Sequence, residues 1–186
     1  MPTSPDTQHG ISWVELLAVL AIVAVLALVA APSFSQVRAN AASLAASQAL
    51  LGALHLARSQ ALLLSVPAVL CLSADGRRCL SDARRFEARG WLVFVDRVRR
   101  RFGGGAAQFD SGDELVRRYA AAAPLRLHGT RAAVTYWPVT RAGTTATFTV
   151  CAPGALAPVR AVIVSQSGRP RLRSRDRGTA PCNASG

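Results

Sequence analysis

The first apolar segment of the chain is a continuous run near the N-terminus. From Leu16 to Ala31 every residue is Leu, Ala, Val or Ile. Counted from Ile11, this run forms a helix about 30 Å long at 1.5 Å per residue. That length matches the hydrocarbon core of a bilayer. The pattern therefore predicts one transmembrane helix over residues 11–32, with a short polar segment, residues 1–10, before it.

Beyond that run, small and aliphatic residues recur at three- and four-residue steps, the spacing of one helix face. They are Ala39, Ala42, Ala46, Leu50, Ala53, Ala57, Ala61 and Leu64. Alanines allow a partner element to approach closely, so this face is expected to pack on a sheet. The pattern stops at Val66-Pro67, because proline disfavours a helix there. Residues 33–66 are predicted to be the packed half of the same helix.

After Pro67 the pattern changes to short apolar or alternating segments. The predicted strands are Ala68–Leu72, Trp91–Val95, Ala133–Trp137, Ala146–Cys151 and Val159–Ser165. Alternation with a period of two is typical of antiparallel strands with one buried face. Asp113–Ala123 is compatible with a helix. Residues 67–186 are therefore predicted to be a β-rich extracytoplasmic domain, and the whole chain an α+β fold with one long helix against antiparallel sheets.

Charge is the strongest compositional signal. The formal net charge is +12, and the basic residues are all arginine, because the sequence contains no lysine. Such a domain attracts polyanions, either nucleic acid or anionic lipid. Genomic base composition is an alternative cause, but it explains the absence of lysine better than the excess of charge.

Four cysteines occur in a chain that is predicted to be exported, so disulfides are expected. Of the three possible pairings we favour Cys71 with Cys79, which brackets a turn-like stretch, and Cys151 with Cys182, which attaches the C-terminal segment. The longer loop would stabilise the fold by roughly 3 to 4 kcal/mol in the chain-entropy model. Neither spacing is typical of a zinc site, and we predict no metal.

A charged residue stands at the start of the apolar run. Glu15 is costly in lipid, and such a position usually indicates a function or a partner. Gly10-Ile11 lies just before it. An alternative is an ordinary signal peptide cut near Ala30-Ala31, which explains neither Gly10 nor Glu15.

The stretch from Gly10 to Leu17 resembles the type IV pilin and pseudopilin class. The resemblance implies that prepilin peptidase cleaves between Gly10 and Ile11, that the new amine on Ile11 is methylated, and that Glu15 serves assembly with other pilins. A carboxylate in lipid is tolerable beside the amine of a neighbouring subunit. Pro32 stands where pilins commonly carry a proline. The leader lacks the basic residue that such leaders usually contain.

Further segments narrow the resemblance to the GspH/FimT family of minor pilins and pseudopilins. They are Leu56–Ala61, Val69–Cys71 through Asp75-Gly76, Gly90–Phe94 and Ser167–Arg171. The family implies a pilin-like fold, an inner-membrane protein with a periplasmic domain, and a place in a pilus or pseudopilus once assembled.

The C-terminal segment places an arginine at every second position. These are Arg169, Arg171, Arg173, Arg175 and Arg177. In an extended strand they would lie on one side about 7 Å apart, close to the spacing of about 6 to 7 Å between successive phosphates on one DNA strand. FimT-like members carry a Gly-Arg-x-Arg ending associated with DNA binding, and the matching residues are Gly168, Arg169 and Arg171. The alternative is a solvated basic tail.

We find no catalytic spacing around His55 or His128 and no phosphate-binding motif at the glycines 103–105, so neither an enzyme nor a cofactor is expected. The sequence favours a minor pilin that binds DNA nonspecifically during uptake in natural transformation. The alternative is a structural pseudopilin of a type II secretion system without DNA binding. A third possibility is a role in attachment or motility.

Overall fold

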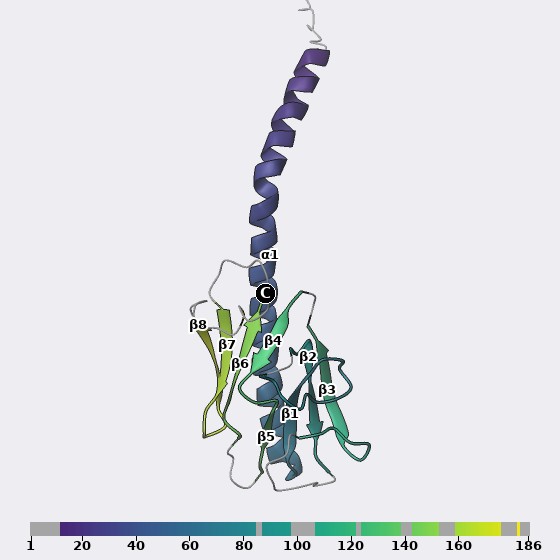
Figure 1. Cartoon of the computed structure of the whole chain (residues 1–186), viewed down its shortest axis with the longest axis vertical. Helices are drawn as coiled ribbons and strands as arrows, with labels where there is room; N and C mark the ends of the chain where they lie inside the picture. Colours follow the sequence, from purple (N-terminus) through teal and green to yellow (C-terminus); the bar gives the residue numbers. More distant parts are fainter. Residues whose placement is uncertain are drawn as a thin grey trace, which may run out of the picture. The chain divides into compact units, whose positions relative to one another are not determined.

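The computed structural model describes residues 12–84, 87–97, 107–121, 124–138, 143–152, 159–175 and 182, with the backbone alone for residues 28–33 and 175. One helix is followed by eight strands (Figure 1). Their bounds are α1 Trp13–Leu64, β1 Ala68–Ser73, β2 Gly90–Val95, β3 Glu114–Ala120, β4 Arg126–Gly129, β5 Ala133–Tyr136, β6 Ala146–Cys151, β7 Val159–Val164 and β8 Pro170–Arg175. The chain divides into two compact units, residues 1–38 and residues 39–186.

The part of α1 in the second unit buries the face that its alanine spacing predicts. Ala46, Leu50, Ala53, Ala57 and Ala61 are all buried, as the alanine spacing predicts. Leu64 was placed on the same face but is 40% exposed, because the helix ends there and the next residue has a positive φ of 55°. Among the residues that the structure describes, no helix is both long enough and apolar enough to cross a membrane.

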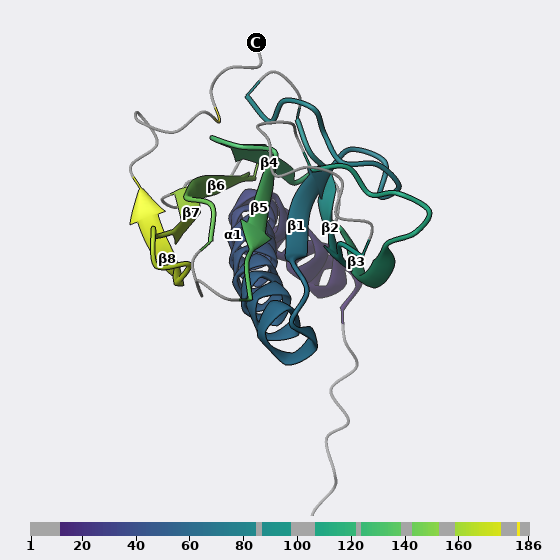
Figure 2. The same cartoon turned by 90° about the horizontal axis from the view of Figure 1, so that it is seen from below.

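The strands form two antiparallel four-stranded sheets. Their strand orders are β3-β2-β1-β5 and β4-β6-β7-β8. Figure 2, which looks along the packed half of α1, shows the strands arranged around the helix. The core joins Leu50 and Leu54 of α1 with Leu70 of β1, Trp91 of β2 and Phe148 of β6. This arrangement is the predicted α+β fold, with a long helix packed against antiparallel sheets.

All five predicted strands are present within one residue of the expected bounds. The prediction of a helix over Asp113–Ala123 is wrong, because Glu114–Ala120 is the edge strand β3 and pairs with β2. Tyr119 of β3 stacks on buried Trp91, the residue it pairs with in β2, with 4.0 Å between ring centroids. The four-residue strand β4 was not predicted.

Both favoured disulfides are present. Cys71–Cys79 covers the outer face of the first sheet, where it joins a second apolar cluster with Val69, Leu92 and Phe94. Phe109 packs on Phe94 there, with 5.3 Å between ring centroids. Cys151–Cys182 links the end of β6 to the C-terminal segment across 31 positions. The central strands β1 and β2 of the first sheet are therefore buried on both faces.

Candidate nucleic-acid interface

The predicted arginine row begins at β8, the edge strand of the second sheet. In its register with β7, Arg171 pairs with Ile163 and Arg173 pairs with Ala161. Alternate residues of a strand face opposite sides of the sheet. Leu172 accordingly packs against the core, whereas Arg171 and Arg173 are exposed. The chain is therefore extended over β8, which is the conformation that spaces alternate arginines about 7 Å apart.

A tight turn joins β7 to β8 and positions the start of the row. The Gly168 amide donates to the Ser165 carbonyl at 2.8 Å, and the Ser165 amide donates to the Arg169 carbonyl at 3.1 Å. The Arg169 amide also donates to Ser165 Oγ at 3.3 Å. Gly168 has a φ of 72°, in the left-handed region where glycine is favoured. Arg169 is consequently exposed directly after the turn.

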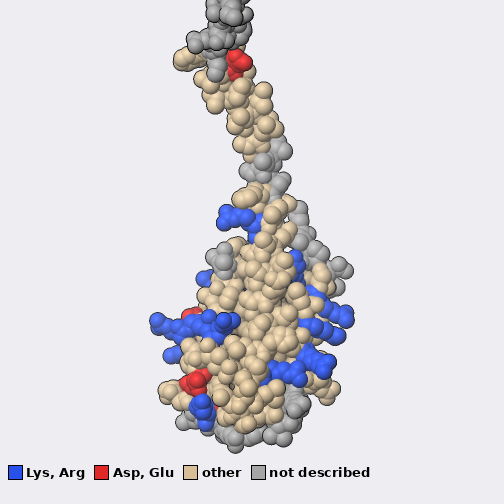
Figure 3. All heavy atoms as spheres, turned by 180° about the vertical axis from the view of Figure 1, so that it is seen from behind, with Lys and Arg blue, Asp and Glu red and all other residues tan. Residues whose placement is uncertain are grey.

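The stretch of sequence that leads up to and forms β8 carries charge of one sign. From Leu115 to Arg175 the sequence contains no Asp or Glu. Among the residues that the structure describes, no acidic side chain forms an ion pair with Arg169, Arg171 or Arg173. Figure 3 shows basic side chains without acidic ones along the right-hand flank, the side of β8. Because no carboxylate among the described residues pairs with them, these guanidinium groups are available to an external anion.

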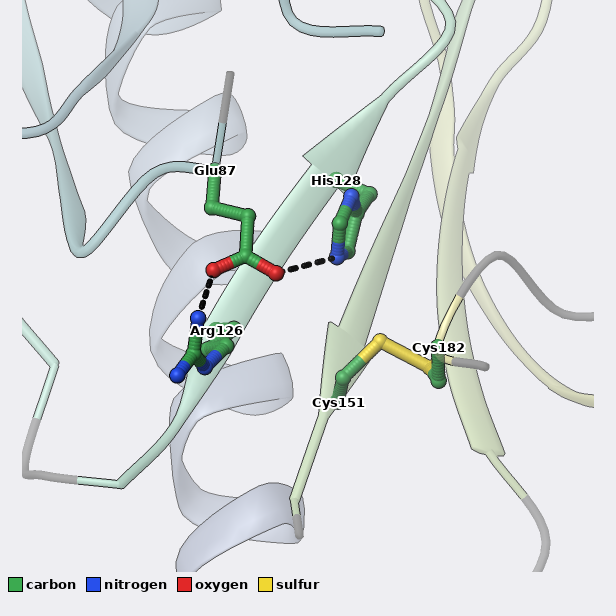
Figure 4. Close-up of polar contacts among 5 residues, drawn as sticks. All are labelled: Glu87, Arg126, His128, Cys151 and Cys182. Carbon is green, nitrogen blue, oxygen red and sulfur yellow. Dashed lines mark hydrogen bonds and ion pairs between the residues drawn. A yellow bond between two sulfur atoms is a disulfide. The ribbon is translucent and has the colours of Figure 1, made fainter. Parts of the chain in front are cut away.

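Two other arginines differ from this row because each forms an ion pair with an acidic residue. Arg97 Nη2 lies 2.6 Å from Glu114 Oε2, although both side chains are about half exposed. Arg126 of β4 pairs with Glu87, whose second carboxylate oxygen lies 3.7 Å from His128 Nε2 (Figure 4). The ion-paired Arg97 and Arg126 are thus less suited to phosphate binding than the arginines of β8.

The Cys151–Cys182 disulfide, also drawn in Figure 4, encloses the whole of this hairpin. The chain between the two cysteines contains β7, the turn and β8. A bond of this kind restricts the unfolded chain and so stabilises the folded state. Strand β8 is therefore held by its pairing with β7, and the disulfide closes the segment that contains the hairpin.

Arg58, which belongs to one of the family-like segments, interacts electrostatically with buried Tyr136. Burial raises the pKa of the Tyr136 phenol to about 12, while the positive charge of Arg58 opposes that shift. Tyr136 is therefore neutral at any physiological pH. Arg58 is half-buried on α1 and acts as the charged neighbour of this tyrosine rather than as part of the arginine row.

Several predicted site residues lie outside the described residues. These are Gly10, Ile11, Arg177 and the stretch 99–101, and for Arg175 the backbone alone is described, within β8. Glu15 is exposed on α1.

Sequence reasoning missed Ser165, whose hydroxyl and backbone groups hold the turn, although a serine three residues before a glycine is a signal for such a turn. It also missed the 115–175 stretch without acidic residues.

Comparison with known protein families shows which family the chain belongs to. Residues 46–168 match the family model described as type II transport protein GspH. The chain belongs to the GspH family. This confirms the family predicted from the sequence, while the FimT-like subtype stays a prediction. The match ends at Gly168, so the arginines of β8 lie beyond the part that matches the family model.

Two solved structures of similar proteins show the range of resemblance. The type IV minor pilin FimU of Pseudomonas aeruginosa is 19% identical, with a TM-score of 0.46 over 74% of this chain and 98% of that chain. The minor pseudopilin EpsH from the type 2 secretion system of Vibrio cholerae is 15% identical, with a TM-score of 0.45 over 69% of this chain and 93% of that chain. No curated protein sequence matches the chain.

Proposed function

We propose that this GspH-family protein is a minor pilin that binds DNA without sequence preference during DNA uptake. The observation that carries the proposal is the pair of exposed arginines, Arg171 and Arg173, on the outward side of edge strand β8, with Arg169 beside them. Arginine forks bind phosphate oxygens strongly, and phosphate contacts carry no direct sequence information. The protein acts by binding and assembly rather than by catalysis.

Assembly is proposed to depend on the N-terminal half of α1. Its large apolar side chains are more than half exposed, among them Trp13, Leu16 and Val25. Such a surface needs lipid or neighbouring subunits to cover it. We propose an inner-membrane anchor over residues 11–32, cleavage by prepilin peptidase between Gly10 and Ile11, and a role for Glu15 in joining other pilins.

A second candidate function is that of a structural pseudopilin in a type II secretion system. It is favoured by the family description, which names a type II transport protein. The arginines of β8 separate the two candidates, because a purely structural subunit has no need of DNA affinity. A secretion defect with normal transformation in a strain carrying the R171Q/R173Q variant would support this second role.

The direct test replaces two arginines in the full-length protein, held at one copy per lipid nanodisc. The R171Q/R173Q variant should bind a 20-bp duplex more weakly than the wild type. Each phosphate contact contributes about 0.9 to the slope of log K against log salt, so the slope should fall by about 1.8. Fluorescence anisotropy at several salt concentrations measures both quantities.

The matched control is R97Q/R131Q, which removes the same formal charge from exposed positions outside β8. It should leave the salt slope near that of the wild type. Equal slopes for R171Q/R173Q and wild-type protein would show that β8 does not contact phosphate, and the DNA-binding proposal would then be wrong.

A further inference from the structure

A second group of exposed arginines lies on a loop that the fold holds rigidly. The loop joins β1 to Cys79 and carries Arg77 and Arg78, both exposed. Its two ends are linked by the Cys71–Cys79 disulfide. Just beyond it, the Leu80 amide donates to the Leu72 carbonyl at 2.8 Å. The loop is therefore fixed to the sheet at its base.

Hydrogen bonds inside the loop fix its tip as well. The Arg77 and Arg78 amides donate to Asp75 Oδ1 at 2.8 and 2.9 Å. Ser73 Oγ donates to the Arg78 carbonyl at 2.6 Å and accepts from the Gly76 amide at 2.9 Å. One oxygen of the loop's single carboxylate is thus held by backbone N–H groups. The side chains of Arg77 and Arg78 project from a backbone that is already ordered.

Strand β3 adds a third arginine to this group. A Cβ atom at Gly76 would lie 3.4 Å from Cδ of Arg118, so the Arg118 side chain runs alongside the loop. Arg118 is itself exposed. We call Arg77, Arg78 and Arg118 the loop surface, and Arg169, Arg171 and Arg173 the β8 surface. Each surface presents three exposed guanidinium groups on ordered backbone.

The two surfaces lie on different sides of the domain. The loop packs over the first sheet, next to edge strand β3, whereas β8 is the edge strand of the second sheet. Figures 1 and 2 both show β3 and β8 on opposite sides of α1. A short DNA duplex is stiff, with a persistence length of about 150 bp. One such duplex therefore does not bend around the domain to reach both surfaces.

We propose that the loop surface is a second phosphate-binding surface, and that one copy of the protein holds two DNA duplexes at once. This inference rests on the proposed binding of DNA to the β8 surface. Nucleic acid fits the loop surface better than a membrane does. Amphipathic segments that lie in a membrane surface combine their charge with large exposed apolar side chains, and residues 73–78 together with Arg118 contain none.

The test measures bridging by full-length protein at one copy per nanodisc of neutral lipid. Two 20-bp duplexes, one with a donor and one with an acceptor fluorophore, should show energy transfer with the wild type at low salt. R77Q/R78Q/R118Q should still bind one duplex but lose the transfer. R84Q/R97Q/R131Q removes the same formal charge from exposed positions outside both surfaces and should keep the transfer.

The outcomes separate this inference from the proposed function. If R77Q/R78Q/R118Q bridges the duplexes as well as wild-type protein, the loop surface does not bind DNA, whatever β8 does. If R171Q/R173Q loses bridging while keeping one bound duplex, both surfaces are supported. Loss of binding to anionic vesicles by R77Q/R78Q/R118Q, with unchanged bridging, would identify a lipid surface and overturn the inference.

Discussion

Two glycines show how the local backbone decides the effect of the same substitution. Gly168 has a φ of 72° in the turn before β8, whereas Gly52 lies within helix α1 with open space where a Cβ would stand. An added methyl group is strained in the first setting and favours the helix in the second. The turn glycine of the arginine hairpin is thus a structural requirement as well as part of a motif.

We expect Gly168→Ala to lower the free energy of unfolding by about 1 to 2 kcal/mol, because alanine is unfavourable in the left-handed region. Gly52→Ala should raise it by about 0.8 to 1 kcal/mol. Thermal unfolding of both variants beside the wild type measures the two shifts. An unchanged or higher melting temperature for Gly168→Ala would contradict the strained geometry of the turn.

Asp75 predicts a dependence of stability on acid pH. The backbone amides of Arg77 and Arg78 hold the pKa of its carboxyl at about 2, below the ordinary value of 3.8. Its folded-state pKa is therefore below its unfolded-state pKa, so its contribution is complete above about pH 4 and is lost as pH falls toward 2. Chemical unfolding of wild type and Asp75→Asn should differ at pH 6 and converge near pH 2. A difference that is constant across this range would exclude the linkage.

At the scale of elements, the packed half of α1 was the easiest part to predict. Its alanine spacing determines which face is buried, because small side chains at three- and four-residue steps leave room for a sheet. Strand β3 was mispredicted because its arginines and alanines are compatible with a helix. Pairing with β2, which includes the stacking of Tyr119 on Trp91, stabilises the strand through residues distant in sequence. Tertiary packing of this kind leaves no local signal.

The candidate interface was predictable in part for a similar reason. Arginines at every second position indicated an extended row, and the structure has that strand. The alternation could not show that β8 lies at a free edge, because strand order depends on pairings between distant segments. The sequence also contained no sign that Arg118 of β3 lies beside Gly76 in the loop after β1, because the two residues are distant along the chain.

The close approach of α1 to the sheets predicts a sharp contrast between two alanines of that helix. Ala57 is fully buried, whereas Ala45 is exposed. Ala57→Leu should reduce the free energy of unfolding by about 1 to 3 kcal/mol, because the added atoms overpack the core. Ala45→Leu should change it by less than about 0.5 kcal/mol. Urea unfolding measures both, and equal effects would mean that Ala57 does not face the sheets.

At the scale of the whole molecule, charge is unevenly distributed. The acidic residues of the described domain lie between Asp75 and Glu114, and the chain from there to Arg175 is purely basic or neutral. The β8 surface belongs to this stretch without acidic residues, whereas the loop surface lies beside the other sheet. A protein with this distribution is suited to gather polyanions rather than to bind one compact ligand.

The Cys151–Cys182 bond makes the basic hairpin part of a covalent ring that includes β7, the turn and β8. A single proteolytic cut within a ring leaves both new ends attached through sulfur. A protease that nicks the exposed turn would therefore not detach the last strand from the domain. Release of the arginine edge would require reduction of the disulfide as well as cleavage of the chain.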